Sequence, residues 1–191
     1  MLILLSCATT PEIGLLPERA PFPVDPGFSG EVSIRGANVA YYEVAGRDDA
    51  EVLLALRATP RFGAGAHAAT TDWAVRWERP DGGVCTAADV RVFVELTVHV
   101  PRWRAPPDAP AASVGNWQRY VRALSEHEQG HVDRILAIVA RMPEVLAEQG
   151  CDGVDVRGRE ALDVIREANA AYDEATGSGA LQGAVLFLPR G

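Results

Sequence analysis

A change of hydrophobic period near the middle of the chain constrains the fold most. Over residues 113–142, apolar side chains and two histidines recur at intervals of three and four, which is typical of one face of a helix. The members of this face are Trp117, Tyr120, Val121, Leu124, His127, His131, Ile135 and Ile138. Ser113 or Asn116 can cap the start of this helix. Pro143 starts or kinks a continuation that reaches Gln149.

The residues before this helix follow a different pattern. Residues 71–79 and 90–100 alternate apolar with polar side chains, which predicts two strands. Asp81, Gly82 and Gly83 lie between the two segments and favour an antiparallel pairing. We expect Pro101 to close the second strand.

Three weaker patterns complete the predicted elements. Residues 39–44 predict a strand and residues 48–57 a short helix. A second long helix is predicted over residues 157–176, ended by the turn that begins at Gly177. We therefore expect an α+β fold, a small antiparallel sheet packed on two long helices, within one domain covering residues 31–191.

Composition narrows the class of protein. The 191 residues are 48% hydrophobic and carry a formal net charge of -8, without a cluster of Lys and Arg. A protein that binds nucleic acid through its phosphates needs such a basic patch, so we expect no nucleic-acid partner. No apolar run reaches the roughly 18 to 20 residues that span a bilayer.

The N-terminus resembles the start of a bacterial lipoprotein. Residues 1–7 are apolar and end in Leu-Leu-Ser-Cys, similar to the site at which lipoprotein precursors are cut and acylated, here at Cys7. The basic residues of a full signal peptide are missing. Residues 8–30 are rich in Pro and Gly and are expected to be a tether. This places the protein in the cell envelope or outside the cell, with a membrane contact only through a lipid on Cys7. The alternative is a frayed terminus with a chance cysteine.

The other two cysteines form an even pair. In an exported chain, Cys85 and Cys151 are expected to form a disulfide. Two buried free thiols are the alternative.

The pentapeptide from His127 to His131 carries the strongest chemical signal. Histidines four residues apart leave the same face of a helix and can share one tetrahedral metal ion, for which Zn(II) fits best. Glu128, beside the first histidine, can act as general base toward a water that zinc acidifies. A solvated helix surface is the alternative. Against it, both histidines lie on the apolar stripe, and Gly130 indicates that something packs closely against that turn.

Several segments together resemble a known family. They are residues 71–77, residues 90–103, Trp117-x-x-Tyr120, His127-Glu-x-Gly-His131 and Ala171-Tyr-Asp173-x-x-Thr176. In this order they resemble a bacterial family of unknown function described as predicted secreted zinc-dependent proteases. The resemblance covers approximately residues 38–187. It implies a zincin-like metallopeptidase site.

The sequence leaves several candidates for the third metal ligand. The resemblance implies a histidine at the position of Ser178, and serine is a poor zinc ligand. Asp173 on the second helix is the favoured third ligand. Glu167 or Glu174 are alternatives under a different helix rotation, and loss of the ligand is another.

Four other polar residues have possible roles near the predicted site or outside it. Tyr172 is a candidate donor to a developing oxyanion, with a core tyrosine as the alternative. Arg134 is expected to pair with Asp173 or with a substrate carboxylate, or to form a surface salt bridge. His67 and His99 are expected in a loop and at a strand edge, not among the metal ligands.

The expected function is a zinc-dependent hydrolase, an endopeptidase of the envelope that acts on a peptide or protein substrate. One of the strands 71–79 and 90–100 would form the edge along which an extended peptide aligns. The alternative is a non-catalytic envelope lipoprotein with a structural or vestigial metal site. A zinc-handling protein would need further clustered ligands, and the chain shows none.

Overall fold

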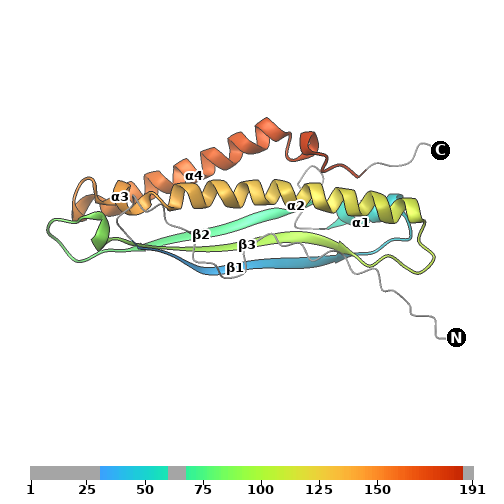
Figure 1. Cartoon of the computed structure of the whole chain (residues 1–191), viewed down its shortest axis with the longest axis horizontal. Helices are drawn as coiled ribbons and strands as arrows, with labels where there is room; N and C mark the ends of the chain where they lie inside the picture. Colours follow the sequence, from blue (N-terminus) through green and yellow to red (C-terminus); the bar gives the residue numbers. More distant parts are fainter. Residues whose placement is uncertain (1–30, 60–67, 187–191) are drawn as a thin grey trace.

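The computed structural model describes residues 31–59 and 68–186, which form an α+β fold with helices on one face of a three-stranded sheet (Figure 1). In chain order the elements are β1 (Glu31–Val44), α1 (Asp49–Ala58), β2 (Thr70–Glu78), the 3-10 turn η2 (Ala87–Asp89), β3 (Arg91–Trp103), α2 (Ala111–Val139), α3 (Met142–Ala147), η3 (Cys151–Gly153), α4 (Val154–Thr176) and η4 (Ala180–Gln182). Both long helices match the predicted ones closely.

The sheet is mixed, and its strand order is β1-β3-β2. β2 and β3 pair antiparallel, as the turn residues between them predict. β1 pairs parallel with β3, so the expectation that the whole sheet is antiparallel is wrong for this pair of strands. The chain leaves β1 through α1 and β2 before it reaches β3, so no tight turn forces β1 to run opposite to its neighbour.

β1 begins well before the predicted residue 39. The pairing with β3 shifts between Ile34 and Gly36, so Arg35 is an extra residue in β1. This irregularity puts Val32 and Ile34 on the same face as Val39, although their numbers differ in parity. The alternation of side chains between the two faces of the sheet, which predicts a strand from sequence, therefore breaks at Arg35.

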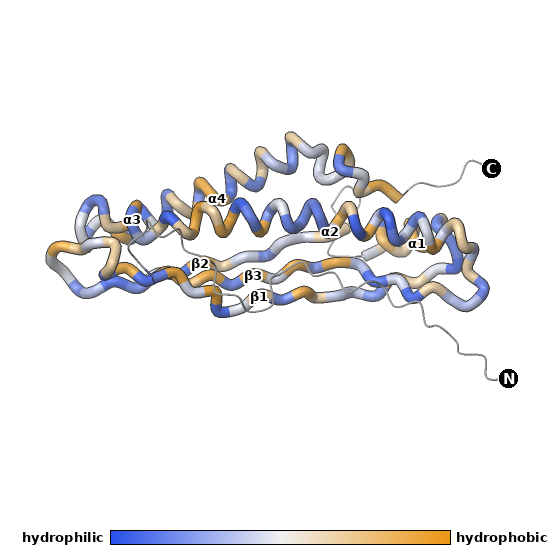
Figure 2. The backbone as a smooth tube through the Cα atoms, viewed as in Figure 1, coloured by the Kyte–Doolittle hydropathy of each residue, from blue (hydrophilic) through white to orange (hydrophobic). Residues whose placement is uncertain are grey.

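The core lies between the sheet and the helices. One face of β3 is almost fully buried: Val92, Val94, Leu96, Val98 and Val100 are each at most 1% exposed. The tube coloured by hydropathy in Figure 2 shows apolar positions recurring along β3 and α2, which face each other. The opposite face of the sheet carries ion pairs, among them His99 with Asp72 at 3.2 Å. His99 therefore lies inside β3, the central strand, which continues to Trp103, so the expected position at a strand edge is wrong.

Two boundary predictions are wrong. β3 continues through Pro101, which pairs with Tyr42 of β1, and ends at Trp103. α2 begins at Ala111, and neither predicted cap residue caps it. Ser113 and Asn116 instead donate hydrogen bonds to the Asp49 carboxylate of α1 (2.9 and 3.2 Å), because α1 packs against the first turns of α2.

Cys85 and Cys151 are joined by a disulfide, with their Cα atoms 4.8 Å apart, as predicted. The bridge ties the connection between β2 and β3 to the turn between α3 and α4.

None of the helices in the described part of the chain is long and apolar enough to cross a membrane. Cys7, the tether 8–30 and His67 lie outside the described residues.

Candidate metal centre

Two histidines and an aspartate meet where α2 and α4 pack together. His127 and His131 lie one turn apart on α2 and are 1% and 8% exposed, so both imidazoles point into the protein as the apolar stripe predicts. Asp173 comes from α4, which runs along α2 (Figure 1). These three residues form a group whose donor atoms could hold a metal ion.

The three donor atoms form a nearly regular triangle. Asp173 Oδ1 lies 3.2 Å from His127 Nε2 and 3.2 Å from His131 Nε2. The two Nε2 atoms are also 3.2 Å apart. Ligands of a tetrahedral zinc ion, each roughly 2.0 Å from the metal, are about 3.3 Å from one another. The separations therefore fit three of the four positions around zinc.

Hydrogen bonds at the far side of each ring fix which nitrogen faces the triangle. The Asn169 amide donates to the Ile165 carbonyl oxygen (2.9 Å), which leaves Asn169 Oδ1 to accept from His131 Nδ1 (2.6 Å). Gln182 Oε1 lies 2.9 Å from His127 Nδ1 and can accept a hydrogen bond from it. In a neutral imidazole the proton then sits on Nδ1, and Nε2 presents a lone pair.

This arrangement calls for a cation. Two imidazole lone pairs and a carboxylate oxygen converge at hydrogen-bond distance, and three acceptors at such a distance repel unless a positive charge lies between them. Burial lowers the pKa of His127, which favours the neutral, metal-binding form of its ring. The donor set of two imidazoles and one carboxylate is typical of zinc.

Glu128 is buried beside these ligands. Its side chain is 1% exposed, and one of its oxygens accepts a hydrogen bond from Thr71 Oγ1 of β2 (2.7 Å). Burial raises the pKa of the Glu128 carboxyl to about 7, the Thr71 hydrogen bond opposes this, and the nearby Asp173 charge adds to it. Thr71 thus links the edge of the sheet to the centre.

Tyr172 of α4 packs onto the same turn of α2. Its ring stacks on His127, with centroids 5.0 Å apart and an interplanar angle of 16°. A Cβ atom on Gly130 would lie 2.1 Å from the Tyr172 phenol oxygen, so the predicted close packing at Gly130 is confirmed. The phenol oxygen accepts from the Gln182 amide at 3.0 Å.

Arg134 supports Tyr172 and does not pair with Asp173. Its guanidinium lies 3.6 Å from the centroid of the Tyr172 ring and donates to the Gly130 carbonyl oxygen (2.7 Å). No ion pair joins Arg134 to Asp173 in the described parts of the chain, so that expected pairing is wrong. The reason is geometric, because the Tyr172 ring occupies the side of α4 that Arg134 reaches.

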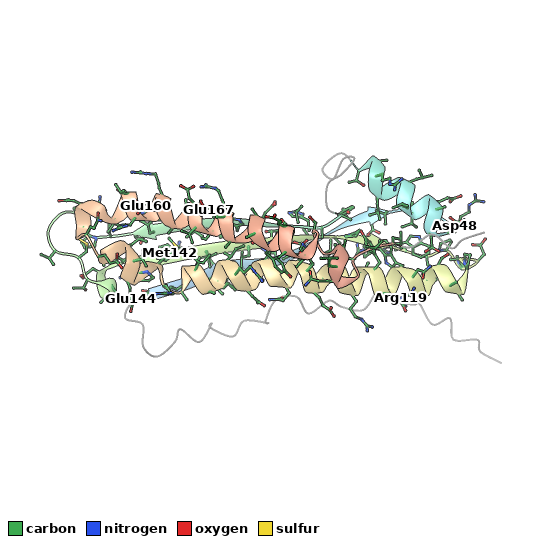
Figure 3. All side chains as sticks on the ribbon, turned by 90° about the horizontal axis from the view of Figure 1, so that it is seen from above. Asp48, Arg119, Met142, Glu144, Glu160 and Glu167 are labelled. Carbon is green, nitrogen blue, oxygen red and sulfur yellow. A yellow bond between two sulfur atoms is a disulfide. The ribbon has the colours of Figure 1, made fainter. Side chains whose placement is uncertain are left out.

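The other predicted ligand candidates lie elsewhere. Glu167 and Glu174 are exposed, and Glu167 points away from α2 (Figure 3). Ser178 lies in the turn after α4 with φ of 55°, and its N–H donates to the Asp173 carbonyl oxygen (2.7 Å). Beside it, Gly179 contacts His127 so closely that a Cβ atom would be 3.0 Å from the ring.

Sequence reasoning missed three partners of the centre: Thr71, Asn169 and Gln182. Asn169 and Gln182 lie outside the segments that carry the family resemblance, and Thr71 begins one of those segments but received no role there. Asn169 carried a usable signal, because it precedes Asp173 by four residues and therefore shares its face of α4. Thr71 and Gln182 reach the centre only through the tertiary fold.

Comparison with known proteins identifies the family. Residues 39–180, well over half of the chain, match the model of a family described as "Bacterial protein of unknown function (DUF922)". The match includes the pentapeptide and Asp173, and its description names neither zinc nor proteolysis. A search of the curated proteins and a search of the solved structures each found no match. The chain therefore belongs to this bacterial family of unknown function.

Proposed function

We propose that this protein is a zinc-dependent hydrolase that cleaves peptide bonds, with a zincin-like site. The observation that carries the proposal is the triangle formed by His127 Nε2, His131 Nε2 and Asp173 Oδ1, with sides of 3.2 Å. Bound there, zinc would polarise a carbonyl group and acidify a water molecule.

Glu128 is the general base of the proposed reaction. It follows the first ligand along α2, and Thr71 holds its Oε2 in place (2.7 Å). Its Oε1 has no hydrogen-bond partner among the described residues and is available to take a proton from the attacking water. Glu128 then passes this proton to the leaving amine.

β2 is the strand along which we propose that the peptide aligns. β3 lies in the middle of the sheet, so residues 90–100 form no edge, and that alternative is wrong. β2 has a strand neighbour on one side in the described part of the chain, and its Thr71 contacts Glu128. An extended peptide that adds to the edge of β2 would therefore pass beside the general base.

Tyr172 is the proposed donor to the developing oxyanion. Its ring stacks on His127, and its hydroxyl lies beside Gly130 and donates to Gln182 Oε1 at 3.4 Å, a long hydrogen bond that would have to be exchanged for one to the oxyanion. A Tyr172→Phe variant keeps the stacking and removes the hydroxyl. It is expected to retain zinc and to lose about 10-fold to 1,000-fold in kcat.

The cell envelope is the proposed location. The disulfide between Cys85 and Cys151 suits an oxidising compartment. Acylation of Cys7 followed by the tether 8–30 would place the domain beside a membrane. Labelling of the full-length protein with a radioactive fatty acid in bacteria tests this, and a Cys7→Ala variant should lose the label.

Cleavage of a denatured protein substrate by the zinc-loaded enzyme tests the hydrolase proposal. Glu128→Gln should keep the zinc and lose about 100-fold or more in rate, because it removes the base. Glu126→Gln is the matched control, since Glu126 is exposed on the same helix. Equal rates for the wild type and Glu128→Gln would remove Glu128 from its proposed role.

A second function is favoured by the burial of Glu128. A side chain that is 1% exposed and bound to Thr71 is also what a structural metal site would contain. In this alternative the protein is a non-catalytic envelope lipoprotein that works through protein contacts, and Ser178 reflects a site that has lost a ligand. Zinc in the wild type without cleavage of any denatured protein substrate would support it.

A further inference from the structure

A hollow beside the metal centre has no role in the proposed chemistry. Its volume is about 280 Å³, and it is lined by Asn116, Arg119, Ala123, Gln182, Gly183 and Val185. Gln182 belongs to both sites, because its Oε1 lies 2.9 Å from His127 Nδ1. The hollow and the candidate metal centre are therefore neighbours.

The position of this hollow along α2 gives its distance from the centre. Residues 116, 119, 123 and 127 are spaced by three or four and share one face of the helix. At about 1.5 Å per residue, Ala123 lies roughly 6 Å and Arg119 roughly 12 Å from His127 along the helix axis. An extended peptide covers the longer distance in about four residues.

A buried carboxylate orients the polar wall of the hollow. Asp49 is 3% exposed and accepts hydrogen bonds from Ser113 Oγ (2.9 Å) and from Asn116 Nδ2 (3.2 Å). The Asn116 amide is thereby turned so that its oxygen accepts from the Arg119 guanidinium. Arg119 is thus held over the hollow by a chain of hydrogen bonds that starts in the core.

Arg119 retains positive charge to offer a ligand. No carboxylate forms an ion pair with it in residues 31–59 and 68–186, although the whole chain carries a net charge of -8. Figure 3 shows Arg119 on α2, on the side of η4 that is toward α1. Ala123 and Val185 supply an apolar lining, and Asn116 and Gln182 supply amides.

We propose that this hollow is a substrate subsite for a carboxylate, bound by Arg119 about four residues from the cleaved bond. The inference rests on the proposed peptide hydrolase function and adds a preference to it. An acidic side chain and a C-terminal carboxylate share this chemistry. Arginine binds either one through two parallel N–H groups, and the apolar lining contacts the stem that carries the acid.

Binding of peptides to the zinc-loaded Glu128→Gln protein tests the subsite without turnover. The probes are four libraries of fluorescent octapeptides that contain either Glu or Gln and end in either a free carboxylate or an amide. The library with Gln and a terminal amide is neutral, and the other three are acidic. At least one of the acidic libraries should bind about 10-fold tighter than the neutral amide library. A gain with Glu identifies a side chain, and a gain with the free terminus identifies the C-terminal carboxylate.

Arg119→Gln should abolish that preference, so that the acidic libraries bind no tighter than the neutral amide library. Arg122→Gln is the matched control, because Arg122 is exposed on α2 and does not line the hollow. No preference for acid in any library, or a preference that survives Arg119→Gln, overturns the subsite. Cleavage of denatured protein by the wild type tests the hydrolase proposal separately, so the failures of the two proposals are distinguishable.

Discussion

The Tyr172 phenol oxygen lies so close to Gly130 that a Cβ atom on residue 130 would be only 2.1 Å from it. This contact joins α4 to the turn of α2 that carries both histidines. It also keeps the Tyr172 ring stacked on His127. A glycine, otherwise a poor helix residue, is therefore required at the point where the two helices approach each other.

Gly130→Ala is expected to destabilise the protein. The added methyl group must displace the Tyr172 ring. Overpacking of this kind costs about 1 to 3 kcal/mol, and because the overlap is large we expect a cost in the upper part of this range, above the roughly 1 kcal/mol that alanine gains in helix propensity. Urea unfolding of the metal-free protein measures the free-energy change. We also expect weaker zinc binding, because the displaced ring moves His127.

Gly115→Ala is the matched control on the same helix. The nearest group to a Cβ atom there is the Arg119 guanidinium, at 3.9 Å, which is an ordinary contact. This variant should be as stable as the wild type or more stable by up to about 1 kcal/mol. If both variants shift stability equally, the contact with Tyr172 is not the cause.

Thr71→Val is expected to destabilise the metal-free protein by about 1 to 3 kcal/mol, because the buried Glu128 carboxylate loses its donor. Thr71→Ser keeps the hydroxyl and should retain most of the stability. Thermal unfolding of the two variants beside the wild type makes the comparison. Equal melting temperatures for Val and Ser would show that the hydrogen bond contributes nothing.

Asn169→Ala should lower zinc affinity about 10-fold to 100-fold, because it removes the acceptor that orients the His131 ring. Competition with a zinc chelator measures the affinity. Glu167→Gln, on the exposed side of the same helix, should bind zinc like the wild type. Equal losses in the two variants would point to general damage to α4.

Reduction of the disulfide should lower the free energy of unfolding by about 2 to 4 kcal/mol, because the bridge closes a long loop between positions 66 residues apart. The paired Cys85→Ser and Cys151→Ser variant should show the same loss and no further effect of reductant. Urea unfolding with and without dithiothreitol is the measurement. If the free energy of unfolding of the wild type is the same with and without dithiothreitol, the disulfide does not contribute to stability.

The sequence predicted the elements that rest on local periodicity. Apolar residues at helical spacing located α2 and α4, and the segment 81–83 indicated the antiparallel pairing of β2 with β3. The histidine spacing also placed two side chains on the buried face of α2. These features depend on residues that are close in the chain.

The features that sequence reasoning missed depend on contacts between distant segments. The parallel pairing of β1 with β3 has no local signature, and the extra residue Arg35 hides the first half of β1. Ser113 has the character of a helix cap, yet it bonds to Asp49, which is 64 residues away. Gln182 becomes recognisable only when His127 lies beside it, at 2.9 Å from its Oε1.

The most direct test of the central claim is the zinc content of the purified protein, measured by mass spectrometry after zinc loading and dialysis. The wild type should retain about one zinc per chain, as should His99→Ala, whose histidine lies on the sheet. His127→Ala, His131→Ala and Asp173→Ala should each lose it. A wild type that retains no zinc, or an Asp173→Ala variant that binds zinc as tightly as the wild type, would contradict the account.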